Sequence, residues 1–117
     1  HYSARRQRQM CIRDRDTFDV ATAFETLYFW EDPDKAFCEI LRILKPGGIF
    51  LIACEASNPH NTTWTDRIEG MSVYTAEEIK HKLENCGFVH VRTDKMKKES
   101  ICVTAQKTKE PTQYSNL

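Results

Sequence analysis

The chain has 117 residues, of which 40% are hydrophobic and 29% charged, and its formal net charge is zero. This composition is typical of one globular domain or part of one. Its longest apolar run, Ile49–Cys54, is far shorter than the roughly 20 residues that a membrane-spanning helix needs, and no apolar signal-peptide segment follows the start. The sequence therefore predicts no membrane partner and a cytoplasmic location.

Residues 1–15 differ from the rest of the chain in charge. They carry five arginines against one aspartate, a net +4, while the remaining 12 basic and 16 acidic residues give −4. A basic arm can bind nucleic acid, but this segment has no hydrophobic period and its Arg-Gln-rich run resembles translated adapter sequence. We interpret residues 1–15 as a disordered, non-native leader and predict no nucleic-acid partner.

The cysteines and histidines do not form a metal-binding pattern. Zinc sites need closely paired ligands at set spacings, and no Cys-x-x-Cys pair occurs here. We therefore predict no metal, and we expect reduced, mostly buried thiols of a cytoplasmic protein. The five cysteines are Cys11, Cys38, Cys54, Cys86 and Cys102.

The first expected elements are a strand and a helix. Phe18–Phe24 is a short, mostly apolar run, typical of a strand buried on both faces. Asp32 can cap a helix that has Pro33 at its first position, and apolar residues recur at helical spacing over residues 36–44. Lys45-Pro46-Gly47-Gly48 ends this helix, because proline cannot continue it and glycine permits a positive φ.

A second strand and a second helix follow. Ile49–Cys54 predicts another buried strand, and a helix between two such strands makes a right-handed crossover, so the strands should be parallel. Residues 55–71 are polar and predict a long loop. Thr75 and Glu78 form the capping box of the next helix, which ends at Gly87.

Two further strands complete the predicted sheet. Phe88–Asp94 alternates in polarity, as a half-exposed edge strand does, whereas Ile101–Ala105 is more uniformly apolar, as a central strand is. Because only residues 95–99 separate them, we expect an antiparallel hairpin. The polar residues from 106 onward are expected to fray.

Three stretches of the chain resemble class I S-adenosylmethionine-dependent methyltransferases: Phe18–Val20 with Asp32-Pro33, residues 40–52 around the Lys-Pro-Gly-Gly turn, and Tyr74–Ile79 with Cys86-Gly87-Phe88. The resemblance covers about residues 16–107 and implies an α/β, Rossmann-like fold with a mostly parallel sheet that ends in an antiparallel hairpin. In the family's sheet order, 3-2-1-4-5-7-6, the chain would supply strands 4, 5, 7 and 6. Residues 108–117 would form a disordered tail.

The family holds its cofactor mainly through a glycine-rich turn and an acidic residue after its first two strands. Neither is found before Phe18, so the resemblance implies only the C-terminal half of the domain. We expect the isolated chain to be nearly inactive and to bind S-adenosylmethionine no tighter than about 1 mM. We also expect a Gly-x-Gly-x-Gly turn roughly 60–90 residues upstream in the reading frame, and self-association through the unpaired edge of Val20–Phe24.

Ligands of open α/β sheets bind beyond the carboxyl ends of the parallel strands. The resemblance implies that the methionine part of S-adenosylmethionine lies against Ala23, Phe24, Glu25 and Thr26. It implies that a small-molecule methyl acceptor contacts Tyr28, Trp30, Glu55 and Trp64. Methyl transfer needs mainly positioning, but a weakly acidic acceptor would need a base, for which Glu55 and His60 are the candidates. Core packing for the aromatic residues and a solvated loop for the polar ones remain open alternatives.

Two other functions share parts of this pattern. A non-catalytic α/β partner-binding module, such as a response-regulator-like domain, would have parallel last strands and an acidic cluster at the strand ends. A nicotinamide-dependent dehydrogenase half would share the parallel core but not the hairpin. The direction of Ile101–Ala105 relative to Ile49–Cys54 therefore tests the resemblance, while the methyl acceptor cannot be derived from the fold.

Overall fold

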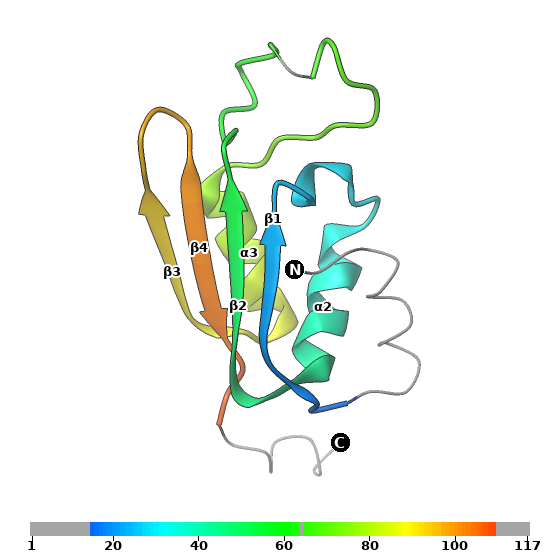
Figure 1. Cartoon of the computed structure of the whole chain (residues 1–117), viewed down its shortest axis with the longest axis vertical. Helices are drawn as coiled ribbons and strands as arrows, with labels where there is room; N and C mark the ends of the chain where they lie inside the picture. Colours follow the sequence, from blue (N-terminus) through cyan, green and yellow to red (C-terminus); the bar gives the residue numbers. More distant parts are fainter. Residues whose placement is uncertain (1–14, 64, 110–117) are drawn as a thin grey trace.

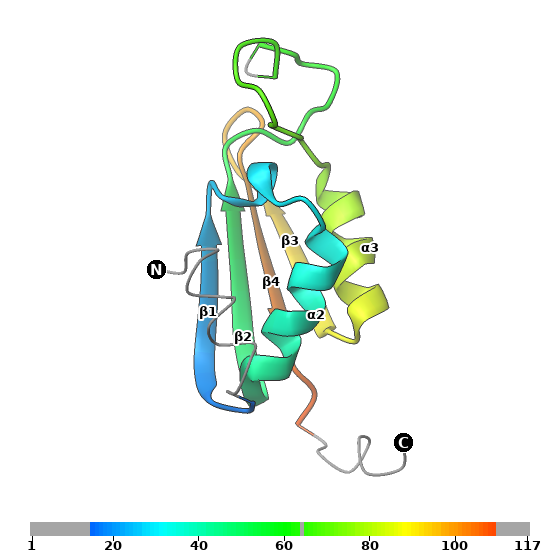
Figure 2. The same cartoon turned by 90° about the vertical axis from the view of Figure 1, so that its right-hand side faces the viewer.

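The computed structural model describes residues 15–63 and 65–109. Four strands form one sheet in the order β1-β2-β4-β3, and helices α2 and α3 lie together on one of its faces (Figures 1 and 2). The predicted leader, apart from Arg15, lies outside the described residues, as do Trp64 and most of the predicted tail. The elements are β1 (Phe18–Phe24), the 3-10 helix η1 (Leu27–Phe29), α2 (Pro33–Ile43), β2 (Leu44–Cys54), α3 (Ala76–Cys86), β3 (Val89–Lys95) and β4 (Ile101–Gln106).

The strand directions agree with the prediction. β1 and β2 are parallel, and β3 and β4 form an antiparallel hairpin. β4 lies between β2 and β3 and runs antiparallel to β2, with Val103 opposite Ile52. The described sheet is therefore mixed, with β4 central and β3 at an edge, as expected from their polarity patterns.

Helix α2 begins where the sequence predicts and ends at Ile43, two residues before the Lys-Pro-Gly-Gly corner. The Lys35 amide donates to Asp32 Oδ1 over 3.1 Å, and Pro33 holds the first helical position. Leu44 is already extended and pairs with Phe18 of β1, so strand pairing draws the corner into the start of β2. Within this corner Gly48 is required, because a Cβ there would lie 2.9 Å from the Lys45 carbonyl oxygen.

Helix α3 confirms the predicted caps at both ends. The Glu78 amide donates to Thr75 Oγ1 over 3.1 Å, and the Thr75 amide donates to Glu78 Oε1 over 2.9 Å. Gly87 ends the helix in the left-handed region, with φ of +115°. Reciprocal capping provides hydrogen-bond acceptors for two amides that have no partner within the helix. Because both capping residues are close together in sequence, the sequence predicts this boundary.

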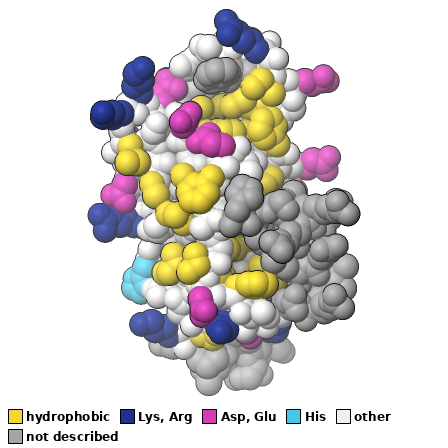
Figure 3. Space-filling model, viewed as in Figure 1, with side chains coloured by type: hydrophobic (Ala, Val, Ile, Leu, Met, Phe, Trp, Pro, Cys, Tyr) yellow, Lys and Arg dark blue, Asp and Glu magenta, His cyan; other side chains and the backbone are white. Residues whose placement is uncertain are grey.

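The core lies between the sheet and the two helices. Phe50 of β2 is fully buried there, with ring centroids 5.7 Å from Phe37 and 5.8 Å from Phe88. The opposite sheet face carries hydrophobic side chains over the strands (Figure 3), among them Val20 and Phe24 at 57% and 45% exposure. The prediction that β1 is buried on both faces is therefore wrong for the described residues, because α2 and α3 cover the same face.

Strand β3 departs from the predicted alternation. Its pairing with β4 shifts register between Val89 and Arg92, and His90 has a φ of +52°. Phe88 lies just before the strand and is buried. An irregularity of this kind turns side chains to the other face, so a strict period of two could not hold over Phe88–Asp94.

The polar residues after β4 do not fray at once, contrary to the prediction. Gln106 belongs to β4, and Lys107 is the one buried charged residue in the described ranges. Lys107 Nζ donates to Asp16 Oδ1 over 2.6 Å and to the Leu44 carbonyl oxygen over 2.8 Å. The ammonium is stable in the interior because a carboxylate and carbonyl groups surround it.

Candidate functional site

The carboxyl ends of β1 and β2 lie side by side, with Phe24 opposite Ala53. The chain then turns at Glu25, whose φ of +58° lies in the left-handed region and whose amide donates to the Ala53 carbonyl oxygen over 2.9 Å. Such a backbone is uncommon outside glycine and concentrates at functional sites. The turn brings the predicted Ala23–Thr26 segment to the ligand-binding end of the parallel strands.

Tyr28 joins the two strand ends. Its hydroxyl donates to Glu25 Oε1 over 2.7 Å and accepts from the Ala56 amide over 3.0 Å. Its carbonyl oxygen accepts from the Ser72 amide over 2.8 Å. Tyr28 is only 5% exposed, so it holds the turn after β1, the start of the following loop and the segment before α3 together. We call these contacts the Tyr28 bridge.

Two protonated groups accompany the Glu25 carboxylate in this cluster. Burial raises the pKa of the Tyr28 phenol above its usual 10.0, and the neighbouring Glu25 adds to the rise. Burial and the charge of Glu25 likewise raise the pKa of the Cys54 thiol to about 12. Both groups therefore keep their protons at neutral pH, and Tyr28 acts as a hydrogen-bond donor toward Glu25.

Thr26 supplies a polar atom without a partner. Its Oγ1 is buried and makes no hydrogen bond within residues 15–63 and 65–109. A buried hydroxyl left unpaired is unfavourable, and a ligand that hydrogen-bonds to it would remove this cost. The turn after β1 thus offers one carboxylate and one unsatisfied hydroxyl to a polar or cationic ligand.

The loop after β2 is anchored to the β3–β4 hairpin. Ser57 Oγ donates to the Glu99 carbonyl oxygen over 2.6 Å, and Asn61 Nδ2 donates to Glu99 Oε2 over 3.1 Å. The predicted candidates Glu55 and His60 are exposed in this loop. Within the described ranges, neither side chain is hydrogen-bonded or ion-paired to the Glu25 turn, and Trp64 lies outside those ranges.

The aromatic residues that follow β1 differ in how far they are buried. Trp30 is half-buried and packs edge-on against Phe37, with ring centroids 5.9 Å apart, so it anchors α2. Phe29 is 50% exposed and lies edge-on to Tyr28 at 6.1 Å. Sequence reasoning did not single out Ala56 or Ser72, because their backbone contacts with Tyr28 leave no periodic signal.

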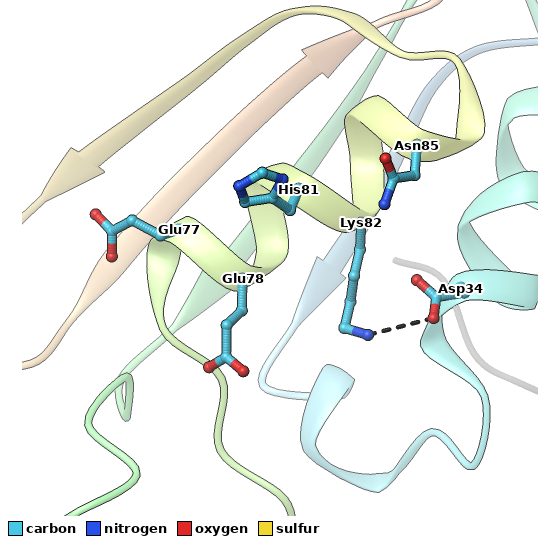
Figure 4. A pocket seen from close by; sticks show the side chains of 6 residues that line it. All are labelled: Asp34, Glu77, Glu78, His81, Lys82 and Asn85. Atoms are coloured by element: carbon cyan, nitrogen blue, oxygen red, sulfur yellow. Dashed lines mark hydrogen bonds and ion pairs between the residues drawn. The ribbon is translucent and has the colours of Figure 1, made fainter.

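A hollow of about 340 Å³ lies elsewhere, between α2 and α3 (Figure 4). Lys82 Nζ is 3.3 Å from Asp34 Oδ2 and 5.7 Å from the centre of the Tyr74 ring, and Glu78 serves in the helix cap. No predicted site residue lines this hollow, so we place the candidate site at the strand ends. Its lining residues are Asp34, Glu77, Glu78, His81, Lys82 and Asn85.

Neither a metal centre nor a membrane-spanning helix occurs in the described parts of the chain. No three His, Cys, Asp or Glu side chains there are grouped so that they could hold a metal ion. The helices of those parts are too short and too polar to cross a bilayer.

Comparison with known proteins agrees with the topology. A family model described as a methyltransferase domain matches residues 5–52. A complex between the Haloferax volcanii Trm112 methyltransferase activator and a methyltransferase contains a chain of similar structure, with a TM-score of 0.72 and 21% identity over 81% of this chain and 56% of the other. The chain therefore shares the α/β fold of these methyltransferase structures.

Two further solved structures extend this comparison. A SAM-dependent methyltransferase from Thermotoga maritima has a TM-score of 0.68 and 18% identity, over 81% of this chain and 58% of the other. The [4+2]-cyclase SpnF has a TM-score of 0.63 and 19% identity, over 82% and 52%. The chain thus spans somewhat more than half the length of these structures. A search of curated proteins found no match.

S-adenosylmethionine is the methyl donor implied by the similar structures. The Glu25 carboxylate and the unpaired Thr26 hydroxyl suit the charged methionine end of this cofactor. The adenosine end needs a glycine-rich turn after a strand. Gly47 and Gly48 lie instead near the start of β2, at the other end of the sheet. Gly70 lies in a loop, and Gly87 lies at the end of α3. The described residues therefore fit one end of the cofactor.

Proposed function

We propose that this chain forms the strand-end part of the active site in an S-adenosylmethionine-dependent methyltransferase that acts on a small molecule. The observation that carries the proposal is the turn after β1, where Glu25 adopts a left-handed backbone and Thr26 leaves a buried hydroxyl unpaired. This turn stands at the end of the sheet where ligands of α/β folds bind. The matching family model and the shared fold support the same reaction class.

S-adenosylmethionine supplies a methyl group on a positively charged sulfur, which is already activated for transfer. The task of the protein is then to hold the donor and acceptor in line and to exclude water. Glu25 would attract the cationic methionine end, Thr26 would hydrogen-bond to it, and the backbone of Ala23 and Phe24 would border it. The Tyr28 bridge keeps the Glu25 carboxylate in place for this role.

We place the methyl acceptor between the exposed Phe29 ring and the loop after β2. Trp30 and Glu55 complete this proposed acceptor side, and Trp64, the further acceptor residue expected from the sequence, lies outside the described residues. The hairpin contact at Glu99 supports it, because Glu99 holds the loop at Ser57 and Asn61. An acceptor with a weakly acidic O–H or N–H would lose its proton to Glu55 or His60.

Calorimetric titration with S-adenosylmethionine tests the proposal. We expect saturable but weak binding, with a dissociation constant of about 1 mM or more, because the described residues fit only the methionine end. Glu25→Gln should abolish this binding, whereas Glu84→Gln on the exposed side of α3 should retain it. No heat at saturating concentrations would contradict the proposed function, and a micromolar constant would contradict the partial fit.

The alternative function is a non-catalytic α/β module that binds a partner without the cofactor. The fold admits activities other than methyl transfer, since a structure described as a [4+2]-cyclase shares it. Under this alternative, Glu25→Gln would change nothing in the titration. We also propose a cytoplasmic location, because unpaired, scattered cysteines are typical of proteins from reducing compartments.

We further propose that the isolated chain self-associates through a second copy. β1 has a strand neighbour on one side only within the described sheet, and Val20 and Phe24 are exposed on its open face. Unpaired apolar strand edges recruit other chains. Size-exclusion chromatography with light scattering should give species larger than a monomer, which Val20→Lys should reduce. A sharp, stable monomer at high concentration would contradict this proposal.

A further inference from the structure

Two cysteines face each other where α2 packs against α3. The Cys86 thiol donates to the Asp34 carbonyl oxygen over 3.2 Å, and Cys38 lies near enough to this thiol to raise its pKa. Asp34 stands one turn before Cys38 in α2, so both contacts belong to one turn of that helix. The two thiols therefore lie close together across the helix interface although they are 48 positions apart in sequence.

The two helices are held together on both sides of this thiol pair. Lys82 is ion-paired to Asp34 over 3.3 Å, as Figure 4 shows. Beyond the pair, Gly87 approaches α2 so closely that a Cβ would lie 3.2 Å from Leu41 Cδ2. Contacts on either side fix the spacing of the helices, so the approach of the sulfurs is a property of the packed interface.

The two thiols differ in accessibility. Cys38 is the one exposed cysteine among the described residues, whereas Cys86 is half-buried. Burial and the contact with Cys38 raise the pKa of Cys86 to about 12, so Cys86 stays protonated and is slow to react with a dissolved oxidant. Cys54 and Cys102 also have raised pKa values because of burial. Among the described cysteines, we therefore expect Cys38 to react first with a dissolved oxidant.

We propose that Cys38 and Cys86 form a redox-sensitive pair that closes into a disulfide between α2 and α3 when the protein meets a peroxide. The peroxide oxidises the Cys38 thiol to a sulfenic acid and is itself reduced to water. The Cys86 sulfur then attacks the Cys38 sulfur, the S–S bond forms, and the sulfenic oxygen leaves as water with the Cys86 proton. Two thiols and one hydrogen peroxide thus become one disulfide and two waters.

This bond would stabilise the part of the chain that carries the candidate site. The loop that it closes contains β2 and the whole loop after β2. Helix α2 begins a few residues after η1, and α3 begins a few residues after Ser72. Closing a loop of this length restricts the unfolded chain, which raises the melting temperature by about 10 °C. A thiol reductant reverses the change.

Peptide mapping of the 117-residue chain tests the proposal. The protein is treated with one equivalent of hydrogen peroxide, its free thiols are alkylated, and a non-reducing tryptic digest is analysed by mass spectrometry. We expect residues 36–42 linked to residues 83–92, in a monomer that has lost the mass of two hydrogens. Cys102→Ser is the matched control and should give the same link. Cys38→Ser and Cys86→Ser should lose both the link and the rise in melting temperature.

Three results would overturn the proposal. One is a Cys38 peptide recovered as a sulfenic or sulfinic acid while Cys86 is alkylated as a free thiol. Another is a main link from Cys38 to any cysteine other than Cys86, or links found only in dimers. The third is an unchanged rise in melting temperature in Cys38→Ser.

Discussion

Replacing Tyr28 with phenylalanine removes one oxygen atom from the Tyr28 bridge and leaves the ring in place. The variant therefore loses the 2.7 Å hydrogen bond from the Tyr28 hydroxyl to the Glu25 carboxylate and the 3.0 Å hydrogen bond from the Ala56 amide to this hydroxyl. Glu25 is exposed and regains water, whereas the Ala56 amide is part-buried and does not. Hydrogen bonds to charged groups and unpaired buried donors each account for about 1–3 kcal/mol, so we expect Tyr28→Phe to lower the free energy of unfolding by about 2 kcal/mol.

Urea unfolding monitored by circular dichroism measures this loss. The matched control is Tyr74→Phe, because the Tyr74 hydroxyl makes no hydrogen bond with the described residues and its ring stays over Lys82. The control should change the free energy by less than about 0.5 kcal/mol. Measurements at several protein concentrations separate the effect from self-association, which makes apparent stability depend on concentration.

The outcome can refute the reasoning in two ways. A loss below about 0.5 kcal/mol in Tyr28→Phe, as small as that expected of Tyr74→Phe, would mean that the bridge does not join the strand ends in solution. An equal loss in both variants at about 2 kcal/mol would mean that removing a phenol is unfavourable here regardless of its bonds. Either result would also remove the support that the bridge gives to the position of Glu25.

Three further changes have definite expected results. Lys107→Met removes the buried ammonium from its carbonyl partners and should lower the free energy of unfolding, measured by urea unfolding, by about 2 kcal/mol. The control Lys45→Met removes a lysine from an exposed ion pair and should change this free energy by less than about 0.5 kcal/mol. Gly87→Ala should lose more than about 1 kcal/mol in the same assay, because the position has φ of +115° and a Cβ would press on Leu41. Because the pKa of Cys54 rises from 9.0 to about 12 in the folded state, its contribution to stability is constant below pH 9 and falls between pH 9 and about 12. Urea midpoints across this range should therefore fall less steeply in Cys54→Ala than in the parent chain.

Local chemistry explains which parts of the fold were predictable. Thr75, Glu78 and Gly87 act within one turn of their own helix end, so the sequence around them contains the whole signal. The direction of β4 was also accessible, because a five-residue connection from β3 permits only a hairpin. Features of this kind depend on neighbours in sequence.

The remaining features depend on contacts between distant segments. Lys107 was assigned to a polar tail, yet Asp16 and the carbonyl groups at the end of α2 enclose it. Tyr28 was expected to face a substrate, and its position in the interior follows from the amides of Ala56 and Ser72, which lie far along the chain. Sequence reasoning proposed Ala23–Thr26 as the cofactor segment, but it could not determine which side chains around this segment are exposed.

An NMR titration of the isotope-labelled chain with S-adenosylmethionine tests the proposed site most directly. The amide resonances of Ala23, Thr26 and Ala56 should shift together and saturate with one weak dissociation constant. Resonances of His81 and Asn85, beside the hollow between α2 and α3, should remain unchanged. Shifts that cluster at this hollow, or no shift at the strand ends at saturating cofactor, would contradict the account.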